Sequence, residues 1–475
     1  MVPATTGRSP VRTVVIANIS EFYLPVFRHF HEKEMRAWVE PSRAECDMTL
    51  FWSGDDKLVI TPYPIDRVFV SDVCAILGYR NARLVSPSKT SESLCADIEA
   101  DPELFALLVE VLRNSEKPQI VGWGATKPFY TLADRLRQEG VEFTTPEVPA
   151  VDDYWTVPYL DSKCGFREVC THLSRQAPDI RIPRGFVCAD IDVAVRIAKS
   201  GVFSPGGVVV KANDGVGGYG TLLYSPERFR QHFDFDIEAH LYMSARLMPI
   251  FSAGTIVVEA YIESQAGSEI ASPSIQGIVD PSGRVSIACL AGQIIGPEGR
   301  YIGALISPGI FPAPLVESLH RIGHTIGEAS AALGYRGVFN IDTVLDKNGL
   351  VYCVELNARR TSVKYILDVA TRLFGASFAD SVAIMTNERF SSKQLSGCSY
   401  SNIRSLLAKL LFPIDGKPQG VVVTIASSLA HFARIPQLGF VVIGEDITVA
   451  RSIYSKVCQL LGERTLGSHQ TQPTP

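Results

Sequence analysis

The stretch Lys211-Ala-Asn-Asp-Gly-Val-Gly-Gly-Tyr-Gly-Thr221 places four glycines within six residues, shortly after an apolar run that ends in a lysine. Glycines lack a Cβ atom, so their backbone N–H groups can approach an anion closely and adopt φ values that other residues avoid. The lysine can add a full positive charge to such a loop. The stretch therefore predicts a phosphate-binding site, and an ordinary glycine-rich hairpin turn is the alternative.

The segments on either side of the glycines decide what kind of loop this is. Gly215, Gly217 and Gly220 match the pattern G-x-G-x-x-G, but in a dinucleotide-binding fold those glycines join a strand to a helix. Here residues 208–212 and 221–224 are both β-like, and a helix begins only after them, with Ser225 as its N-cap. The glycines are therefore expected at the tip of a β-hairpin that closes over a triphosphate.

Length and composition set the broad class. The chain has 475 residues, 46% of them hydrophobic and 20% charged, which suits a large core and roughly three domains of about 150 residues. A net charge of −5 and the lack of a long Lys/Arg run argue against nucleic acid or a membrane as partner. No apolar run reaches the roughly 18 residues that span a bilayer, so we expect a cytoplasmic protein. The ten cysteines contain no Cys-x-x-Cys pair and are interpreted as reduced core residues, not as a zinc site or disulfides.

The first 149 residues alternate short β-like runs with helical patterns, which predicts a parallel sheet with helices on its faces. The strand candidates are residues 14–17, 58–60, 68–70 and 120–121, and the helix candidates are 101–113 and 129–139. The turn Gly122-Trp-Gly-Ala-Thr126 precedes the second helix, so it is either an anion site at a helix N-terminus or a tight turn without a ligand. A proline-bearing crossover at residues 146–158 marks the expected domain boundary.

Two features follow this boundary. Asp161 is expected to cap a helix that runs to about Arg175, which places Lys163 in its first turn, either at a binding site or on the solvated surface. Residues 178–258 are interpreted as an α+β unit that carries the glycine hairpin and leads into a connector at 258–262. Backbone groups of the connector could pair with adenine, and a plain buried strand is the alternative.

A second hairpin is expected within residues 337–360. Two β-rich runs there flank Asn348-Gly349, which is a strong hairpin signal. If these two residues form the loop, positions whose numbers sum to 697 lie opposite each other.

This register places Asp342 opposite Glu355, and Asn340 opposite Asn357, all on one face of the hairpin. Two carboxylates that face each other repel. A divalent cation such as Mg²⁺, which prefers carboxylate and amide oxygens, would turn that repulsion into coordination. An exposed polar face without a metal is the alternative.

The end of the chain carries less chemistry. Arg359 lies two positions beyond Asn357 and so points to the same side, where it could stabilise charge on a reacting oxygen, whereas Arg360 points elsewhere. A solvated arginine is the alternative for either. Strands are expected at 420–424 and 439–443, and a helix at 447–461, with no identifiable chemistry.

The order of these features resembles that of an ATP-grasp ligase. The matching features are Lys163, Lys211 with its glycine hairpin, the connector 258–262, and then Asp342, Glu355 and Asn357. The turn at 122–126 and the overall layout are most similar to actinobacterial peptide ligases of the pheganomycin type. The resemblance implies α/β and α+β parts: a Rossmann-like pre-ATP-grasp domain at 1–149, an ATP-grasp domain at 150–375 with a mobile lid at about 178–258, and a C-terminal cap at 376–475.

The resemblance also implies roles for individual residues. Lys163 and Lys211 would contact the ATP phosphates and adenine, under a hairpin formed by Gly215, Gly217, Gly218, Tyr219 and Gly220. Glu259 would reach the adenine amino group, backbone groups of Ala260 and Ile262 would pair with the ring, and Glu269 would bind the ribose. Asp342, Glu355 and Asn357 would hold two Mg²⁺ ions, and Arg359 matches the family's Asn-x-Arg pattern.

Some positions depart from the family pattern. Asn340 stands where D-alanine-D-alanine ligases carry an arginine, which argues against a dipeptide ligase of that kind. The lid connector carries extra residues at 263–268, and the segment 361–364 is poor in glycine, so the acceptor side stays open. Arg300, in the segment 296–300, is a candidate for pairing with the substrate carboxylate, and a surface loop is the alternative there.

The resulting hypothesis is an ATP-dependent carboxylate-amine ligase. The γ-phosphoryl group of ATP would move to a substrate carboxylate, and an amino acid or peptide amine would then displace phosphate from the acyl phosphate to form an amide bond. The alternatives are an ATP-grasp carboxylase, a thioester-forming ligase and a nucleotide-binding regulator without catalysis. The expected partners are small molecules, and a homodimer stays open because superfamily members are often dimers.

Overall fold

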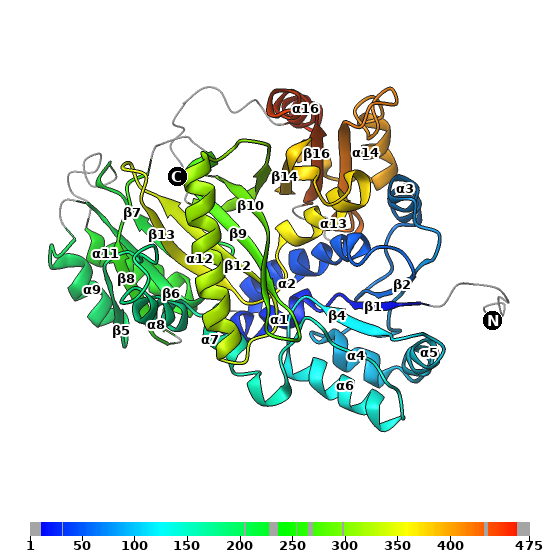
Figure 1. Cartoon of the computed structure of the whole chain (residues 1–475), viewed down its shortest axis with the longest axis horizontal. Coiled ribbons are helices and arrows are strands. Elements are labelled where there is room, and N and C mark those ends of the chain that lie inside the picture. The colour runs from blue at the N-terminus through cyan, green and yellow to red at the C-terminus, as the bar shows by residue number, and fades with distance from the viewer. Residues whose placement is uncertain are drawn as a thin grey trace.

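The described residues of the computed structural model form three β-sheets flanked by helices (Figure 1). The structure describes residues 11–462 apart from 31, 204–205, 228–235, 253, 265–268, 297–298 and 432–435. Each sheet takes its strands from one stretch of chain: residues 13–122, 185–260 and 273–444. The first sheet is parallel and the other two are antiparallel, which confirms the predicted combination of α/β and α+β parts.

The first sheet has the strand order β3-β2-β1-β4, with every pair parallel. Its strands are β1 (Thr13–Ile16), β2 (Lys57–Ile60), β3 (Ala82–Val85) and β4 (Gln119–Gly122). The accompanying helices are α1 (Ile19–Phe27), α2 (Glu32–Ala44), η1 (Glu45–Phe51), α3 (Arg67–Leu77), α4 (Leu94–Ala100), α5 (Pro102–Arg113) and α6 (Lys127–Gln138).

The strand predicted at residues 68–70 is wrong. These residues lie in α3, where the Asp66 side chain caps the helix by accepting the N–H groups of Val68 and Phe69 at 2.8 and 3.1 Å. Phe69 is fully buried while Val68 is 42% exposed, so the apolar run follows the helical period. The strand beside β2 is β3 instead, whose four residues are all half-buried and gave no clear apolar pattern.

The second sheet has the order β5-β8-β6-β7 and carries the glycine hairpin. Its strands are β5 (Gly185–Cys188), β6 (Val208–Val216), β7 (Tyr219–Tyr224) and β8 (Ile256–Ala260). The helices around it are η2 (Val151–Asp153), α7 (Thr156–Asp161), α8 (Lys163–Leu173), α9 (Ile191–Lys199), α11 (Ile237–Leu247) and η3 (Pro249–Ser252). Lys211 of β6 pairs with Thr221 of β7, so the glycines form the predicted hairpin tip. The helix expected after Ser225 lies mainly outside the described residues.

The cap of α8 differs from the prediction by one residue. The Ser162 hydroxyl accepts the N–H of Gly165 at 3.0 Å, and Asp161 is instead the last residue of α7. The Asp161 carboxylate accepts the N–H of Ala358 at 2.8 Å, so its hydrogen bond links α7 to the end of β13 in the third sheet. Lys163 is the first residue of α8 and so lies in its first turn, as predicted.

The third sheet is antiparallel, with the order β13-β12-β9-β10-β11-β14-β16-β15. Its strands are β9 (Pro273–Val279), β10 (Val285–Ile295), β11 (Tyr301–Ile306), β12 (Gly337–Leu345), β13 (Val351–Asn357), β14 (Ala383–Phe390), β15 (Gly420–Ile425) and β16 (Leu438–Gly444). The accompanying helices are η4 (Glu269–Ala271), α12 (Ala313–Ala332), α13 (Ser362–Phe374), η6 (Phe378–Asp380), η7 (Lys393–Leu395), α14 (Tyr400–Leu406), α15 (Ser428–His431) and α16 (Ile447–Leu460). The strands predicted near 420 and 439 and the helix predicted after 447 are confirmed.

Two helices tie the third sheet to its surroundings. The long helix α12 covers β9 and β10, and Gly323 lets it approach closely, because a Cβ atom there would lie 2.7 Å from Ile287 (Figure 1). On the other side of the sheet, α13 packs against η1 and α3, which belong to the first sheet and its helices, called the first unit below. Arg372 of α13 donates to the carbonyl of Leu77 at 2.7 Å.

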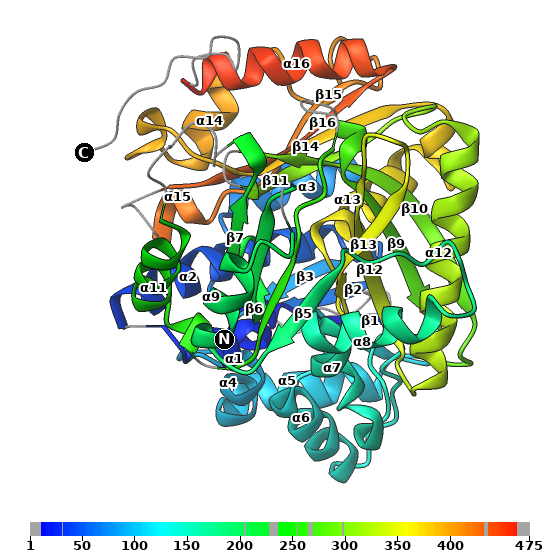
Figure 2. The ribbon, with the colours of Figure 1, turned by 90° about the vertical axis from the view of Figure 1, so that its left-hand side faces the viewer.

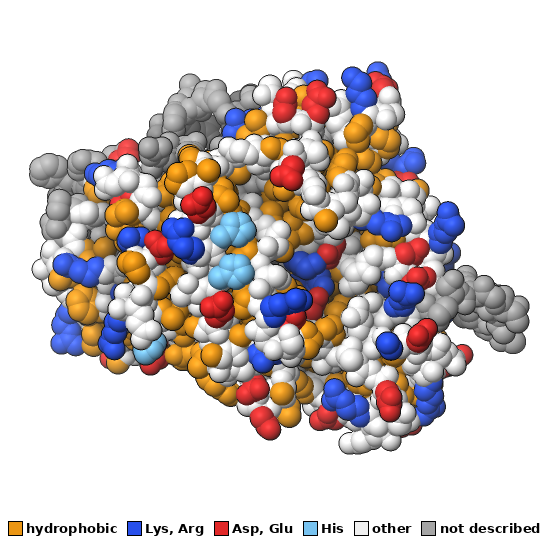
Figure 3. Space-filling model, in the orientation of Figure 1, with side chains coloured by type: hydrophobic (Ala, Val, Ile, Leu, Met, Phe, Trp, Pro, Cys, Tyr) orange, Lys and Arg blue, Asp and Glu red, His pale blue; other side chains and the backbone are white. Residues whose placement is uncertain are grey.

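The glycine hairpin lies in front of the third sheet when the molecule is viewed from the side of the second sheet (Figure 2). On the face with α12, Lys, Arg, Asp and Glu side chains are interspersed (Figure 3). Within the described ranges, none of the helices is both long and apolar enough to cross a bilayer.

Candidate active site

A cavity of about 370 Å³ lies between the glycine hairpin and the third sheet. This volume is within the range of small-molecule sites. Strands β6, β7 and β8 line one side and β9 to β13 the other, while α1, η1 and β14 contribute to the far end. The predicted site residues that line the cavity are Lys163, Lys211, Gly215, Gly217, Gly218, Glu259, Ala260, Ile262, Asp342, Glu355, Asn357 and Arg359.

Lys163 connects α8 to the third sheet. Its Nζ donates to Glu355 Oε1 at 2.9 Å and to the carbonyl oxygen of Gly215 at 3.1 Å. The lysine side chain is only 4% exposed. The solvated-surface alternative is therefore wrong, and Lys163 lies between the hairpin and Glu355.

Lys211 and Glu259 form a buried ion pair on the lid side of the cavity. Arg167 of α8 donates to the second oxygen, Glu259 Oε2, at 3.3 Å, and Lys211 Nζ also donates to the carbonyl of Val354 at 3.4 Å. Buried charges persist only when they are paired in this way. Both oxygens of Glu259 thus face cations, so in this arrangement Glu259 positions Lys211, while the resemblance implied a contact with the adenine amino group.

The connector after β8 forms one wall of the cavity. The N–H of Ala260 is donated to the carbonyl of Arg184 at 2.7 Å, and the N–H of Tyr261 to that of Gly207 at 3.2 Å. Because these donors are committed to the protein, an adenine at this wall would have to use the Ala260 carbonyl and the N–H of Ile262. That is one acceptor and one donor, as the adenine edge requires.

Strands β12 and β13 pair with the predicted register at the site. Asp342 faces Glu355 and Asn340 faces Asn357. The predicted two-residue loop is wrong, however, because Leu345 pairs with Val351 and leaves a connection at 346–350. Next to this connection the strand pairs are displaced by one residue from the predicted register. An irregularity between Asp342 and Thr343 shifts the register by one residue, so Asp342 and Asn340 have their predicted partners.

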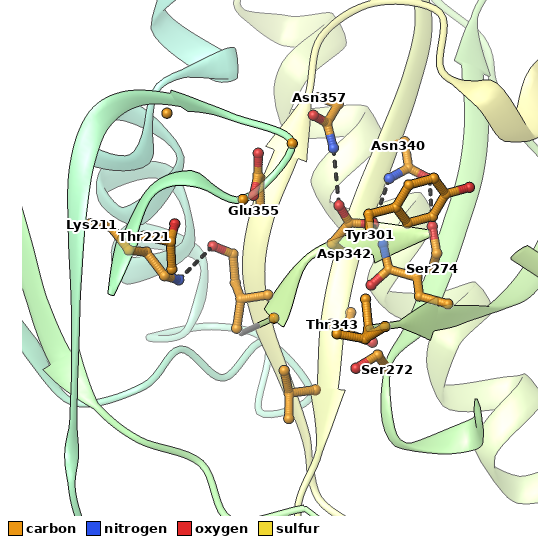
Figure 4. A pocket seen from close by; sticks show the side chains of 18 of the residues that line it. Lys211, Thr221, Ser272, Ser274, Tyr301, Asn340, Asp342, Thr343, Glu355 and Asn357 are labelled. Carbon is orange, nitrogen blue, oxygen red and sulfur yellow. Dashed lines mark hydrogen bonds between the residues drawn. The ribbon is translucent and has the colours of Figure 1, made fainter. Parts of the chain in front are cut away.

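Three side-chain amides surround the Asp342 carboxylate (Figure 4). Oδ1 accepts from Gln293 Nε2 at 2.8 Å and from Asn340 Nδ2 at 2.7 Å, and Oδ2 accepts from Asn357 Nδ2 at 3.1 Å. Burial and the nearby charge of Glu355 raise the pKa of Asp342 to about 6. The neutral amides hold the carboxylate in place but do not neutralise it.

The facing carboxylate behaves differently. Burial acts to raise the pKa of Glu355, but the charges of Lys163 and Lys211 outweigh it and lower that pKa below its usual value. Glu355 is therefore ionised over the whole physiological range, beside an Asp342 that forms no ion pair with any described residue.

The donor set fits a hard divalent cation. Asp342 and Glu355 offer carboxylate oxygens, and the raised pKa of Asp342 marks negative charge that a cation would stabilise. Asn357 turns its Nδ2 to Asp342 and its Oδ1 to Arg359, so its amide would have to rotate before it could coordinate a metal. Over the described ranges no three His, Cys, Asp or Glu side chains gather as a complete metal site, so phosphate or water oxygens would complete the shell.

Arg359 is buried at the back of the cavity. Its Nη2 donates to Asn357 Oδ1 at 2.7 Å, and its Nε lies 3.7 Å from Asp161 Oδ1 without a hydrogen bond of its own. The guanidinium also lies over the rings of Tyr23 and Trp123, at 5.1 and 5.6 Å from their centroids. A buried guanidinium that lines a cavity is suited to bind an anionic group there.

Arg360 points to the opposite side, as predicted, but it is not solvated. Its Nε and Nη2 each donate to Glu147 at 2.6 Å, and its guanidinium lies 4.6 Å from the centre of the Trp52 ring. Its N–H donates to the carbonyl of Trp123 at 2.8 Å. Arg360 therefore joins the first unit to the third sheet.

The turn at 122–126 is held by the protein itself. Asn18 accepts the N–H of Trp123 at 2.8 Å and donates to the carbonyl of Gly124 at 3.1 Å, while Thr126 caps α6 through the N–H of Phe129. These contacts favour the tight-turn alternative. The turn reaches the cavity through the side chain of Trp123.

Gly217 and Gly218 form the tip of the hairpin, with φ values of +57° and +90° that favour glycine. Tyr219 and Gly220 are outside the cavity lining. The Tyr219 ring packs against Phe30 and Trp38, with centroids 4.5 and 5.2 Å away, in place of the expected position at the nucleotide. Gly220 is buried, with φ +80°, where a Cβ atom would lie 3.1 Å from Ala212.

Two other predicted residues are not placed at the cavity. Arg300 is exposed beside the hairpin, its Cα 3.6 Å from where a Cβ of Gly218 would lie, so the surface-loop alternative describes it better. Residues 297–298 of that segment lie outside the described residues. Glu269 begins η4, but its side chain and residues 265–268 of the connector are likewise outside the description.

The far end of the cavity contains residues that the sequence did not single out. Glu388 and Arg389 of β14 both line it, although they are adjacent, because β14 is irregular between Asn387 and Phe390. Arg389 Nη2 donates to Glu45 Oε1 at 3.1 Å, and Tyr301 Oη donates to Glu388 Oε1 at 3.3 Å. The only sequence signal was the run Asn-Glu-Arg at the end of a β-like segment, which is not specific.

Comparison with known proteins gives the fold a name. No family model matches the chain. The chain is 36% identical over 107 residues to a [butirosin acyl-carrier protein]–L-glutamate ligase of Niallia circulans, an alignment that covers 22% of this chain and 25% of that relative.

Similar solved structures cover nearly the whole chain. Biotin carboxylase from Campylobacter jejuni has 15% identity, covers 94% of this chain and 91% of its own, and gives a TM-score of 0.54. The biotin carboxylase domain of the 2-oxoglutarate carboxylase of Hydrogenobacter thermophilus, a dimer solved with MgADP and bicarbonate, has 15% identity, covers 95% and 90%, and gives 0.53. Both are ATP-grasp proteins. With the lysines, hairpin and facing carboxylates in the predicted order, the chain has the ATP-grasp fold.

Proposed function

We propose that this protein is an ATP-dependent carboxylate-amine ligase that forms an amide bond and releases ADP and phosphate. The proposal rests mainly on one observation: a single cavity brings together two buried lysines, two facing carboxylates and a buried arginine. ATP-grasp geometry of this kind suits transfer of a phosphoryl group to a carboxylate. The partial likeness to an acyl-carrier protein–glutamate ligase adds support.

The nucleotide would lie between the hairpin and the third sheet. Lys211 and Lys163 would face its phosphates, while Gly217 and Gly218 would offer backbone N–H groups from above. The Ala260 carbonyl and the Ile262 N–H would meet the adenine edge. Glu259 would act through Lys211, because its two oxygens are already committed to Lys211 and Arg167.

Asp342, Glu355 and Asn357 would hold magnesium, for which we propose two ions. Bound there, the metal would supply positive charge to the phosphoryl group during transfer. Arg359, which lines the cavity, would bind the carboxylate that receives the phosphoryl group. The hairpin would exclude water, since an acyl phosphate hydrolyses readily.

Small molecules are the proposed substrates, with an amino-acid-like acid and an amino acid or peptide amine. A carrier protein that presents one of them is a variant of the same proposal, because the Niallia relative is named for such a partner. We also propose a cytoplasmic protein, since the ten cysteines are all free. The proposed assembly is a homodimer.

A carboxylase is the second candidate, because the structural likeness to biotin carboxylases extends over more than nine tenths of the chain. It shares the nucleotide chemistry and differs in the acid, which would be bicarbonate. A pocket with Arg359 at its back could hold either anion.

The first experiment separates these functions. The protein is incubated with ATP and Mg²⁺, together with pooled amino acids and peptides or with bicarbonate alone, and the nucleotide products are separated. Substrate-dependent ADP from the amino acid pool supports the ligase, and ADP with bicarbonate alone supports the carboxylase. AMP and pyrophosphate in place of ADP would overturn the acyl-phosphate route.

A further inference from the structure

The far end of the cavity is a second polar cluster, separate from the groups that would hold nucleotide and metal. It consists of Tyr301, Glu388 and Arg389, with Glu45 behind them, and these residues come from β11, β14 and η1. Because β14 is irregular between Asn387 and Phe390, two consecutive side chains face the cavity where a regular strand would present one.

The cluster adjoins the phosphoryl-transfer end through two contacts. Burial and the charges of Glu388 and Asp342 raise the pKa of Tyr301, which lines the same cavity as Asp342, and the Tyr301 hydroxyl donates to Glu388 Oε1 at 3.3 Å. On the lid side, a Cβ atom on Gly217 would lie 3.3 Å from Arg389 Nη1. A molecule bound here would therefore sit under the hairpin tip, next to the carboxylate that is activated.

Charge in the cluster favours a zwitterion. Arg389 pairs with Glu45, which accepts its hydrogen bond at 3.1 Å, and the charge of Arg389 also acts on Glu388, the second carboxylate of the cluster. Glu388 is 5% exposed and receives a hydrogen bond from the neutral Tyr301 hydroxyl. The cluster thus offers one carboxylate that an ammonium group can pair with, and the remaining guanidinium donors for a carboxylate.

Resting on the proposed ligase function, we propose that Tyr301, Glu388 and Arg389 form the acceptor subsite, which binds the incoming amine as an amino-acid zwitterion. Glu388 pairs with the ammonium group and takes its proton, and Arg389 pairs with the acceptor carboxylate. The acceptor class is therefore a free α-amino acid or the N-terminal residue of a very short peptide.

The chemical step balances. Glu388 takes one proton from the ammonium, and the freed amine nitrogen attacks the carbonyl carbon of the acyl phosphate. The new C–N bond forms as the bond from carbon to the phosphate oxygen breaks. The second nitrogen proton leaves with the phosphate as hydrogen phosphate, and Glu388 returns the first to solvent.

The surroundings of Glu388 suit this proton transfer. Burial raises its pKa to about 7, opposed by a hydrogen bond from Ser362 and increased by the charge of Glu45. The other titratable groups that face it are Arg389, Tyr301 and Tyr365. A base of this pKa is half ionised at neutral pH and can both accept and release a proton there.

The test uses hydroxylamine as a second acceptor. Hydroxylamine is uncharged at neutral pH and has no carboxylate, so it traps an acyl phosphate as a hydroxamate without needing a base or Arg389. With the twenty amino acids as pooled acid and acceptor, wild type should give both amide and hydroxamate. If wild type gives neither and releases no ADP, the ligase function itself fails.

Glu388→Gln keeps the size of the side chain and removes the base. Amide formation should fall at least about 100-fold, the usual contribution of a general base, while hydroxamate formation stays within about 3-fold. The fall in amide yield below pH 7 in wild type should vanish in this variant. Equal losses of both products, or no loss of either, would overturn the role of Glu388.

Arg389→Met tests recognition of the acceptor carboxylate, with the acid identified in the hydroxamate assay. Wild type should prefer an amino acid over its decarboxylated amine, and the variant should lose about 10-fold or more of that preference through a raised KM for the amino acid. The ratio between two acceptors in one variant does not depend on how much protein is folded. Equal use of the two acceptors by wild type would overturn the zwitterion assignment.

Discussion

The two ends of the cavity handle negative charge in different ways. At the end where we propose that the nucleotide binds, called the nucleotide end below, Glu355 lies against Lys163. The charge of Lys163 outweighs the effect of burial and lowers the pKa of Glu355. At the far end, Glu45 and Glu388 share Arg389, and burial raises the pKa of Glu388 to about 7. Glu355, paired with Lys163, therefore stays ionised at neutral pH, whereas Glu388 can gain and lose a proton there.

The strongest test of the nucleotide end is Glu355→Gln. It removes a proposed metal ligand and the partner of Lys163, so ADP release should fall by at least about 100-fold while the fold is kept. ADP release is measured at saturating ATP and Mg²⁺, and folding by circular dichroism. Asp346→Asn, in the exposed loop of the same hairpin, is the matched control and should keep wild-type activity. Near-normal turnover in Glu355→Gln would refute the metal assignment.

Lys211→Met tests whether the lid-side ion pair serves the nucleotide. The variant leaves Glu259 with Arg167 alone, and loss of one partner of a buried pair costs about 3–5 kcal/mol of stability. We expect a lower melting temperature and a KM for ATP that rises by about 10-fold or more. Lys347→Met, which removes an exposed lysine paired with Glu263, is the control and should change neither value. An unchanged KM would mean that Lys211 only stabilises the lid.

Lowering the pH should weaken metal binding, because Asp342 binds a cation only when it is ionised. Its pKa is raised from 3.8 to about 6, so the affinity for Mn²⁺ as a probe, measured by calorimetry, should be constant above about pH 7 and fall below pH 6. A flat affinity down to pH 5 would contradict the proposed site.

The same shift has the opposite sign for folding. A carboxyl whose pKa is raised in the folded state stabilises the fold at low pH, and this contribution is lost as the pH rises from 3.8 through 6. Without metal at pH 8, Asp342→Asn should therefore melt at the same or a higher temperature than wild type. A clearly lower melting temperature would show that the ionised carboxylate is structural.

The smallest expected effect concerns the hairpin that joins the two ends. Tyr219→Ala removes the ring that packs on Phe30 and Trp38, a contact of the type that contributes about 0.5–1.5 kcal/mol beyond its buried area. The KM for ATP should rise about 2- to 10-fold, and ATP hydrolysis without acceptor should increase as water enters. Tyr219→Phe keeps the ring and should behave as wild type; if it does not, the hydroxyl matters instead.

The nucleotide end could be predicted well because short-range patterns determine it. The glycines fix a hairpin tip, and the pairing of Asp342 with Glu355 follows from two β-runs around one turn. The pairing of Asp342 with Glu355 was predicted correctly although the predicted loop at 348–349 was wrong. The longer loop displaces the register by one residue, and the strand irregularity displaces it back. The prediction of a strand at 68–70 failed because an apolar triplet fits a helix and a strand equally well.

The far end could not be predicted, because its residues are far apart in the sequence and each looks ordinary alone. Glu45, Tyr301 and Glu388 meet only when η1, β11 and β14 have packed around the same cavity. The same holds for Tyr219, which the resemblance places in the hairpin over the nucleotide. Its ring instead packs against Phe30 and Trp38 of the first unit.

By itself, the sequence determined the order of elements, the glycine hairpin and the facing carboxylates, since backbone conformation and strand register are local properties. Tertiary structure alone decided that Glu259 pairs with Lys211, that burial and Glu355 raise the pKa of Asp342, and that β14 supplies Glu388 and Arg389 to the cavity. The reason is physical: the charge state and the partners of a side chain depend on burial and on neighbours that only packing brings together.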